Sequence, residues 1–354
     1  MKRAIAAGVA VTAAFALAAC SSSSKHSGAS TSPTSTAPQT SASQASGGAS
    51  PQGSGGASSQ ASGSATVYGA LTAANGKALA DAFHASHAQE TVDIVTGGTG
   101  ALVTRIETEQ KAGGVRADAL LLADPTVMPQ LDKAGVLDDS YKPDAASQLS
   151  PDMVGTGWFG PFNFYNVIIY KTGTTPVPKD WADLTNPAYK GKIEIGDPSY
   201  SGTTLAMAAE MPKLAGADFF SKLKANGVKI VQSTNTVGND VASGARSIGI
   251  TLDSVYRPLQ AKGSSVQIVW PTSGAIPVPA PAALVKGHDS AVAKDFLSWL
   301  LTPEGQSELV KLGYTPAIGA DQVLPPNTKV ATVPFADLVS QRDSILSAFT
   351  KVFG

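Results

Sequence analysis

Short apolar, β-branched runs alternate along most of this chain with longer segments whose apolar residues recur at helical spacing. From about residue 66 the pattern predicts three strands and three helices in alternation. In order, these are a strand over 66–69, a helix over 75–88, a strand over 91–95, a helix carrying Leu102 and Ile106, a strand over 119–122 and a helix carrying Met128 and Leu131. Strands joined by helices in this way are typical of a mainly parallel sheet in an α/β lobe.

A second series of the same kind follows. It predicts strands over 167–170, 192–195, 228–231, 247–251 and 266–270, with helices over about 203–210, 215–226 and 237–243. A proline-rich run over 276–285 predicts an irregular or edge strand. Three helices close the chain, over 290–301, 303–312 and 335–353.

Two series predict two lobes, because the 289 residues from 66 onward are too many for one ordinary core. We assign residues 66–162 and 276–325 to the first lobe and residues 163–275 to the second. Residues 326–354 are predicted to be a helical segment that packs on the lobes.

The N-terminus carries an export signal. Met1-Lys2-Arg3 precedes an apolar stretch from Ala4 to Ala19, which is too short to span a membrane as a helix. Residues 17–20, ending in Cys20, resemble the lipobox of bacterial lipoproteins. This resemblance implies that residues 1–20 are a signal peptide and that Cys20 becomes a lipidated N-terminus anchored to the membrane. The alternative is a plain secretory signal with an incidental cysteine.

Residues 21–65 contain almost only Ser, Ala, Gly, Thr, Gln and Pro, with Lys25 as the one formal charge. Such a segment cannot bury enough surface to offset its ordering entropy, so it is predicted to be disordered. As a flexible coil it would reach roughly 35–40 Å. We interpret it as a tether between membrane and folded body; a glycosylated stalk is the alternative.

Composition excludes several classes of function. Of the 26 Lys and Arg residues, Lys2, Arg3 and Lys25 precede the body, which leaves 23 against 27 acidic residues and a net charge of about −4. No nucleic-acid partner is therefore predicted. Cys20 is the only cysteine, so the body has no disulfide and no thiolate metal site.

Reacting groups for an enzyme are scarce. The body contains three histidines, of which His84 and His87 are three residues apart on one helix, without a third ligand nearby in the sequence. The position of His288 in Lys286-Gly287-His288-Asp289 indicates a surface turn. Motifs for hydrolysis, zinc proteolysis and phosphate-loop chemistry are absent from the body. The sequence predicts a protein that is not an enzyme and holds no cofactor or metal.

Small, hydroxyl-rich turns recur where a predicted strand passes into a predicted helix. They occupy residues 70–73, 97–100 and 199–204. Free N–H groups at a helix start bind oxyanions, and in open α/β sheets these turns lie at the strand ends where ligands bind. Each turn taken alone is also explained by helix capping. Three such turns across two lobes favour a binding cleft.

Several segments in order resemble the extracellular solute-binding proteins of ABC importers, in the branch that includes ferric-ion, thiamine and phosphonate binders. The matching segments are 66–68, 116–119, 181–192, 196–198, 201–203, 242–244, 249–251 and 303–306. The resemblance implies the type II periplasmic-binding-protein fold, with two α/β lobes closing on a solute. It also implies an ABC permease, through its transmembrane subunits, as partner and an extracytoplasmic location.

The sequence says less about the ligand than about the family. Ferric binders of this branch use adjacent tyrosines in the second lobe, whereas the matching place here reads Asp253-Ser254-Val255-Tyr256. We therefore expect a small anionic or zwitterionic solute, such as an organophosphonate, with Asp124 and Asp253 as possible partners for an ammonium group. Asp253 is equally explained as a structural turn residue, and Tyr256 as part of the core.

Each predicted ligand-binding residue lies either near a predicted helix start or in the second-lobe segment that matches the ferric binders. They are Thr72, Gly98, Thr99, Asp124, Ser199, Ser201, Gly202, Thr203, Asp253 and Tyr256. The alternative functions are ferric iron transport, a secreted enzyme on the same fold, and a surface adhesin or signalling lipoprotein.

Overall fold

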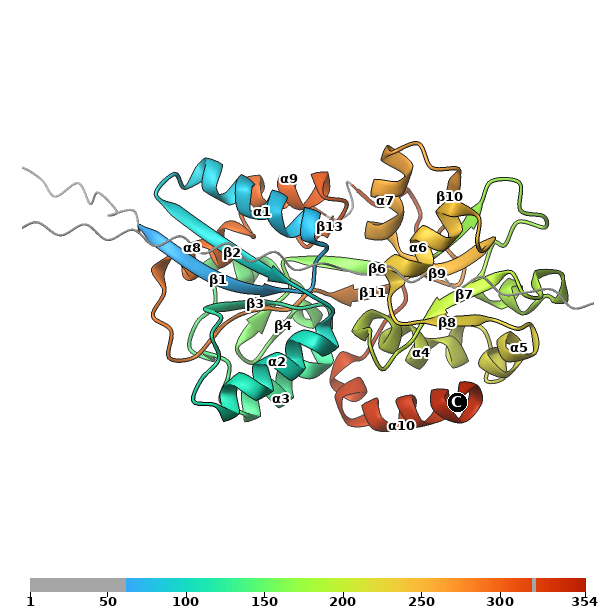
Figure 1. Cartoon of the computed structure of the whole chain (residues 1–354), viewed down its shortest axis with the longest axis horizontal. Coiled ribbons are helices and arrows are strands. Elements are labelled where there is room, and N and C mark those ends of the chain that lie inside the picture. The colour runs from blue at the N-terminus through green and yellow to red at the C-terminus, as the bar shows by residue number, and fades with distance from the viewer. Residues whose placement is uncertain (1–61, 320–322) are drawn as a thin grey trace, which may run out of the picture. The chain divides into compact units, whose positions relative to one another are not determined.

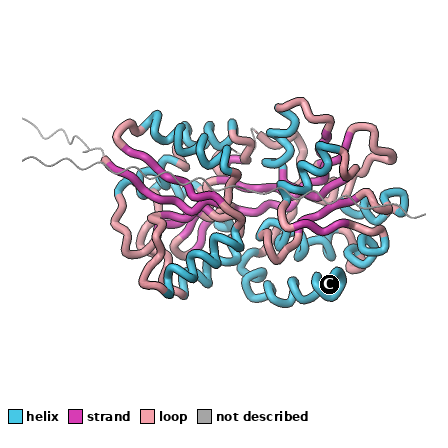
Figure 2. The backbone as a smooth tube through the Cα atoms, in the orientation of Figure 1, coloured by secondary structure: helices cyan, strands magenta, loops and turns pink. Residues whose placement is uncertain are grey.

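Helices flank two separate sheets in the computed structural model, which describes residues 62–319 and 323–354 (Figures 1 and 2). The predicted signal peptide, Cys20 and nearly all of the predicted linker lie outside the described residues. The first strand begins at Gly63, so the last residues assigned to the linker belong to the sheet. Gly63 is there paired with Glu90 in parallel register.

The first lobe contains a six-stranded sheet in the order β2-β1-β3-β12-β5-β4. Its strands are β1 (Gly63–Gly69), β2 (Glu90–Thr96), β3 (Ala119–Leu121), β4 (Val154–Gly155), β5 (Trp158–Phe159) and β12 (Ala282–Leu284). β1 pairs in parallel with β2 and β3, as the strand–helix alternation predicts. β12 arrives from the other lobe and pairs antiparallel with β3 and β5.

Helices flank both faces of this sheet (Figure 1). On one face lie α1 (Ala73–Ser86), α8 (Ala291–Trp299) and α9 (Pro303–Lys311), which share a hydrophobic cluster; α1 and α9 are drawn above the sheet in that view. On the other face lie the lower helices α2 (Thr99–Lys111) and α3 (Met128–Lys133). Leu102, Ile106 and Leu131 of the lower helices are buried in one hydrophobic cluster with Tyr68 and Leu120 of the sheet. Short 3-10 turns complete the lobe: η1 (Pro125–Val127), η2 (Asp144–Gln148) and η3 (Pro151–Met153).

The second lobe has a sheet in the order β10-β6-β9-β7-β8. Its strands are β6 (Phe162–Lys171), β7 (Ile193–Gly196), β8 (Lys229–Val231), β9 (Ile248–Leu252) and β10 (Val266–Val269), with β11 (Ile276–Pro279) and β13 (Thr315–Pro316) pairing with β6. β7 pairs in parallel with β8 and β9, whereas every partner of β6 is antiparallel. Both sheets are therefore mixed.

The helices of the second lobe are α4 (Gly202–Leu214), α5 (Phe219–Ala225), α6 (Thr234–Ser243) and α7 (Asp253–Ala261), with 3-10 turns η4 (Trp181–Thr185) and η5 (Pro187–Tyr189). The sequence analysis missed α7, which is short and contains Pro258. A proline removes a backbone donor and is disfavoured inside a helix, which weakens the helical signal between the strands predicted over 247–251 and 266–270. The last helix, α10 (Phe335–Phe353), has the predicted bounds and contacts α4 and α5.

Strands carry the chain between the lobes. β6 follows β5 of the first sheet and enters the second, and β11 pairs with β6 before the chain returns to β12 (Figure 1). The prediction of two α/β lobes is confirmed.

Candidate functional site

A cavity of about 480 Å³ lies between the two lobes. Its lining includes residues at the starts of helices in both lobes, together with Phe164 of β6 and Tyr314. Among residues 62–319 and 323–354, no Asp, Glu, Lys, Arg or His lines it. The cavity is thus polar without being charged.

Five helices begin at this cavity. Each follows directly on a strand: α1 after β1, α2 after β2, α4 after β7, α6 after β8 and α7 after β9. Residues from the first turn or the cap of all five lie in the lining, for example Thr72, Gly98, Ser201, Ser233 and Ser254. Because the carboxyl ends of parallel strands meet at one edge of a sheet, the helix N-termini converge there. Their partial positive charges add up in one place.

The caps of these helices are not all alike. Thr72 accepts a hydrogen bond from Asn75 N (3.1 Å), and Ser201 accepts one from Thr204 N (3.4 Å). α2 starts at Gly98, where no side chain caps the helix. A cap by Ser or Thr satisfies only one of the free N–H groups of a helix start. Backbone donors therefore remain for a ligand, most completely at α2.

Six of the ten predicted ligand-binding residues line the cavity. They are Thr72, Gly98, Thr99, Ser201, Gly202 and Thr203. Their hydroxyls also bond to the protein: Thr99 Oγ1 accepts from Ala123 N (3.3 Å), and the hydroxyls of Ser201 and Thr203 lie 2.9 Å apart. The other four, Asp124, Ser199, Asp253 and Tyr256, lie outside the lining.

Asp253 starts α7 and is fully buried. One of its carboxylate oxygens accepts from Tyr165 N (3.0 Å), and the other accepts from Thr315 Oγ1 (2.9 Å) and from Arg257 Nη2 (3.1 Å). Burial raises the pKa of this carboxyl, against the opposing effect of Arg257 and the hydrogen bonds. All its partners are within the protein, so this arrangement favours the structural interpretation over contact with an ammonium group.

Asp124 has a different set of partners. Its Oδ1 accepts from Thr126 N (2.9 Å) and Thr126 Oγ1 (2.6 Å), and its Oδ2 accepts from Arg342 Nη1 of α10 (2.8 Å). It lines a smaller pocket of about 220 Å³ together with Ser199. Ser199 donates its hydroxyl to Asp197 Oδ1 (2.5 Å) in a tight turn. Contact of these two side chains with the solute stays a prediction, which this placement does not favour.

Tyr256 packs in a hydrophobic cluster of the second lobe with Tyr165, Val241 and Val266. The sequence analysis instead missed the turn between β8 and α6, where Gln232, Ser233, Thr234 and Asn235 line the cavity. This turn has the same small hydroxyl signature as the others. Because the predicted helix began at 237, the signal was not recognised.

Asn75 and Tyr314 were also missed. Asn75 Nδ2 donates to the Tyr314 hydroxyl (2.8 Å). Burial raises the pKa of Tyr314 to about 12, so its phenol is neutral at physiological pH. No local sequence pattern marks either residue as part of a site, because the contact between them joins positions 239 residues apart in the chain.

The three histidines of the body lie away from the cavity. His84 Nδ1 is 2.7 Å from the carbonyl oxygen of Glu90, the His87 ring stacks on Phe83 and His288 Nδ1 is 3.0 Å from Asp118 Oδ1. Within residues 62–319 and 323–354, no group of three or more His, Cys, Asp or Glu side chains is placed to hold a metal ion. In the same ranges, no helix combines the length and apolarity needed to cross a membrane.

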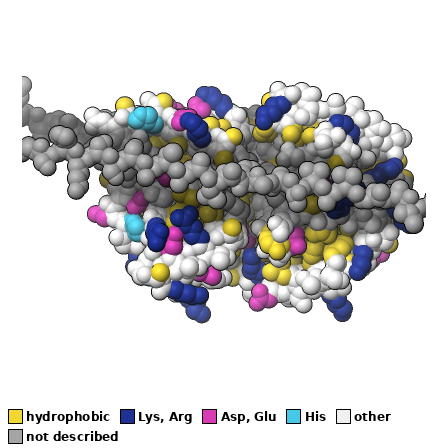
Figure 3. Space-filling model, viewed as in Figure 1, with side chains coloured by type: hydrophobic (Ala, Val, Ile, Leu, Met, Phe, Trp, Pro, Cys, Tyr) yellow, Lys and Arg dark blue, Asp and Glu magenta, His cyan; other side chains and the backbone are white. Residues whose placement is uncertain are grey.

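Charged side chains on the face shown in Figure 3 are scattered singly or in small groups of mixed sign. The surface of the described residues also has exposed ion pairs one helical turn apart, such as Lys77 with Asp81 and Lys222 with Asp218. Exposed pairs of this kind contribute little to stability.

Comparisons with known proteins agree with this architecture. The chain is similar to the fructose-6-phosphate-bound periplasmic binding protein AfuA from Actinobacillus pleuropneumoniae, with a TM-score of 0.71 and 22% identity over 81% of this chain and 97% of that one. It is similar to iron-bound HitA from Pseudomonas aeruginosa, with a TM-score of 0.68 and 24% identity over 81% of this chain and 99% of that one. These likenesses show the fold.

Relatives found by sequence match shorter parts of this chain than the two structures do. The chain is 32% identical to a Haemophilus influenzae protein over 148 residues, which are 40% of this chain and 43% of that protein. It is 26% identical to a sulfate-binding protein from Synechococcus elongatus over 244 residues, which are 64% of this chain and 66% of the relative. The chain therefore spans less than half of the first relative's length and about two thirds of the second's.

The fold and the interlobe cavity together define a two-lobed binding protein of the type II periplasmic class. Residues 65–315 match the family model of bacterial extracellular solute-binding proteins, and the chain belongs to this family.

Proposed function

We propose that this protein is the solute-binding component of an ABC importer, and that its solute is a small organic oxyanion with a phosphonate-like head. The observation that carries the proposal is the convergence of five helix N-termini on a cavity without charged side chains. Helix N-termini present N–H groups and a positive partial charge to an anion. The family membership supports the role in transport.

The neutral lining favours an anion over the other candidates. A zwitterion would require a carboxylate near its ammonium group, and none lines the cavity. Ferric iron would require charged oxygen donors, whereas the ionisable side chains that the described part of the chain contributes to the lining are Tyr200 and Tyr314. The iron-bound neighbour keeps iron as the alternative to be tested.

The size of the cavity favours a solute with a carbon body. Small-molecule pockets usually measure about 300–1,000 Å³, and this one falls within that range. Leu71, Phe164, Leu252 and Val255 supply apolar walls beside the helix starts. The fructose-6-phosphate bound to the structural neighbour is a solute of this general kind.

Delivery follows from closure of the lobes. A solute that contacts both lobes favours the closed state because it has a higher affinity for that state. The closed protein then presents its solute to the transmembrane subunits of a permease, with no covalent step. A lipid on Cys20 and the segment over 21–62 would tether the protein outside the cell.

Isothermal titration with methylphosphonate, 2-aminoethylphosphonate, a phosphate monoester, sulfate and ferric ion tests the proposal. We expect an organic phosphonate or phosphate ester to bind more tightly than sulfate, and the ammonium-bearing phosphonate to bind more weakly than its neutral-bodied analogue. Ser201→Ala with Thr203→Val should weaken binding at least about tenfold, because hydrogen bonds to a charged group are lost.

Ser290→Ala is the matched control. Ser290 caps α8 as Ser201 caps α4, but it lies outside the cavity lining, so its loss should leave affinity unchanged. Tight binding of ferric ion alone, or equal affinity of wild type and the Ser201/Thr203 variant, would refute the oxyanion assignment.

A further inference from the structure

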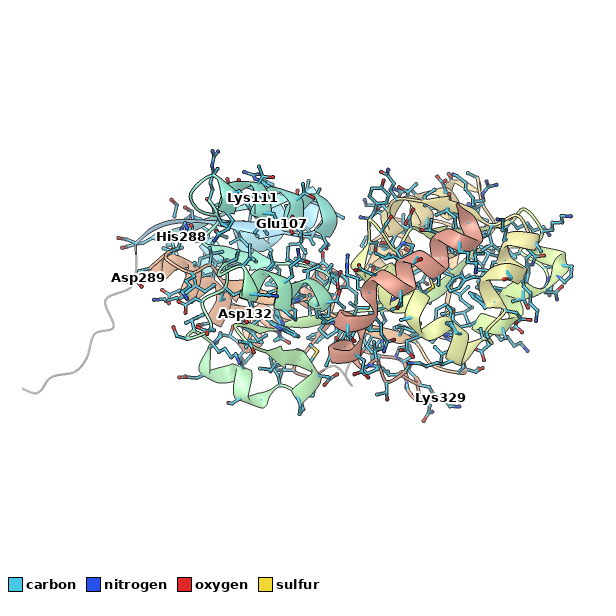
Figure 4. The ribbon with its side chains drawn as sticks, turned by 90° about the horizontal axis from the view of Figure 1, so that it is seen from below. Glu107, Lys111, Asp132, His288, Asp289 and Lys329 are labelled. Carbon is cyan, nitrogen blue, oxygen red and sulfur yellow. The ribbon has the colours of Figure 1, made fainter. Side chains whose placement is uncertain are left out.

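α10 touches both lobes. Its last turns pack on α5, where the Phe349 ring lies 5.5 Å from the ring of Phe220 and 4.6 Å from that of Phe353. Lys224 of α5 donates to the carbonyl of Val352. Earlier in the helix, Arg342 reaches η1 of the first lobe. In Figure 4 the red α10 lies in front of the second lobe, and the other lobe carries the labelled Glu107 and Lys111 of α2.

Arg342 makes two bonds to the first lobe from one nitrogen. Its Nη1 lies 2.8 Å from Asp124 Oδ2 and 2.9 Å from Thr126 Oγ1. The Asp124 side chain is 1% exposed, and the Arg342 side chain is 28% exposed. Loss of Arg342 would leave the buried Asp124 charge without its partner, and an uncompensated buried charge is strongly destabilising.

The lobes also meet at the side of this pair. A Cβ added to Gly202, the first residue of α4, would lie 2.1 Å from the Cβ of Asp124. The backbone of the second lobe therefore approaches Asp124 as closely as only a glycine allows. Asp124 thus contacts the second lobe directly through Gly202 and indirectly through α10.

We propose that Arg342, Asp124 and Thr126 form an interlobe latch, by which α10 holds the two lobes together beside the solute cavity. The latch bonds form only when the lobes are in contact, so they contribute to the closed state and not to the open one. A protein that is partly closed before binding has a higher apparent affinity for its solute. The effect on affinity rests on the proposed function, whereas the effect on lobe separation does not.

Lobe separation can be measured without any solute. Spin labels on Lys133→Cys of α3 and Ser221→Cys of α5, both exposed, report the distance between lobes by pulsed electron resonance. A Cys20→Ser background removes the only native thiol. In the solute-free full chain, Arg342→Gln should shift the distance distribution to longer values and reduce the closed fraction about tenfold relative to the open one.

Lys351→Gln is the matched control, since it removes the same charge from an exposed position at the other end of α10. The double variant Asp124→Asn with Arg342→Gln removes both charges, while the Asn oxygen can still accept from Thr126 N. If Asp124 and Arg342 pair directly, the double variant should be no more open than Arg342→Gln alone.

Unchanged distances in Arg342→Gln would overturn the latch, and so would an equal shift in Lys351→Gln. A double variant that is more open than Arg342→Gln alone would overturn the direct pairing. None of these results depends on which solute binds, so a failure of the latch and a failure of the oxyanion proposal are distinguishable.

Discussion

A carboxylate close to a binding site can serve the fold rather than the ligand. Asp253 begins α7 beside the cavity-lining Ser254, yet its oxygens are directed to Tyr165, Arg257 and Thr315. Tyr165 belongs to the long strand β6, and Thr315 belongs to β13, which pairs with that strand. Asp253 therefore joins a helix start to two strands at the centre of the molecule.

At this scale we expect Asp253→Ala to lower the free energy of unfolding by about 3–5 kcal/mol, because it leaves a guanidinium, an N–H and a hydroxyl without their buried acceptor. Urea denaturation measures the change. Asp289→Ala, which removes an exposed carboxylate paired with Lys294, should leave stability near that of wild type. Wild-type stability of Asp253→Ala combined with lost solute affinity would instead place Asp253 in the binding site.

The position of α10 on the second lobe depends on tertiary contacts. Most helical stability in proteins comes from packing of an apolar face rather than from intrinsic propensity. Among its aromatic residues, Phe349 is 5% exposed and meets Phe220 and Phe353. The aromatic cluster of these three residues fixes the helix on the second lobe.

Phe349→Ala should release α10 from this lobe. Loss of a buried phenylalanine costs about 3–5 kcal/mol, and the Phe349 ring is a buried part of the aromatic cluster that holds the helix. Hydrogen exchange should become faster across α10 and remain slow in the central strands β1, β6 and β9. Ser347→Ala, on the exposed side of the same helix, should change nothing. Slow exchange of α10 in the Phe349 variant would show that other contacts hold the helix.

For the molecule as a whole, the neutrality of the interlobe cavity sets the pH dependence of binding. Within the part of the chain that the structure describes, its ionisable lining residues are two tyrosines, and burial raises the pKa of Tyr314 to about 12. This phenol keeps its proton throughout the physiological range, because its pKa in the folded state lies above the ordinary value near 10. The site itself should therefore not titrate near neutrality.

The affinity for a phosphate monoester should thus be constant between pH 7 and pH 9. It should fall only below about pH 6, where the ester dianion takes up a proton and becomes a monoanion. Calorimetric titration across this range measures the profile. A sulfate ester, which stays a monoanion, serves as the control and should give a flat profile throughout. A step near pH 6.5 with the sulfate ester would indicate a titrating histidine at the site, contrary to the neutral lining.

Much of the fold follows from local spacing. Residue periodicity predicts the longer strands and every helix except α7, and it gives α10 its observed bounds. It misses the two-residue strands β4, β5 and β13, and it treats β11 and β12 as one run. Three of the five helix starts at the cavity, those of α1, α2 and α4, carry a hydroxyl and glycine pattern that is visible in the chain. The other two were hidden, one by a helix start assigned three residues too late and one by Pro258.

What the chain alone determines is therefore the set of elements, the two α/β lobes and the chemistry of the turns, because each depends on residues a few positions apart. Which side chains reach the cavity is decided only by tertiary structure. Asp124 and Arg342 are 218 positions apart, and only the folded chain brings their side chains together. The cavity is neutral for the same reason: its charged neighbours Asp124 and Asp253 are directed to partners from distant segments that only the folded chain brings together.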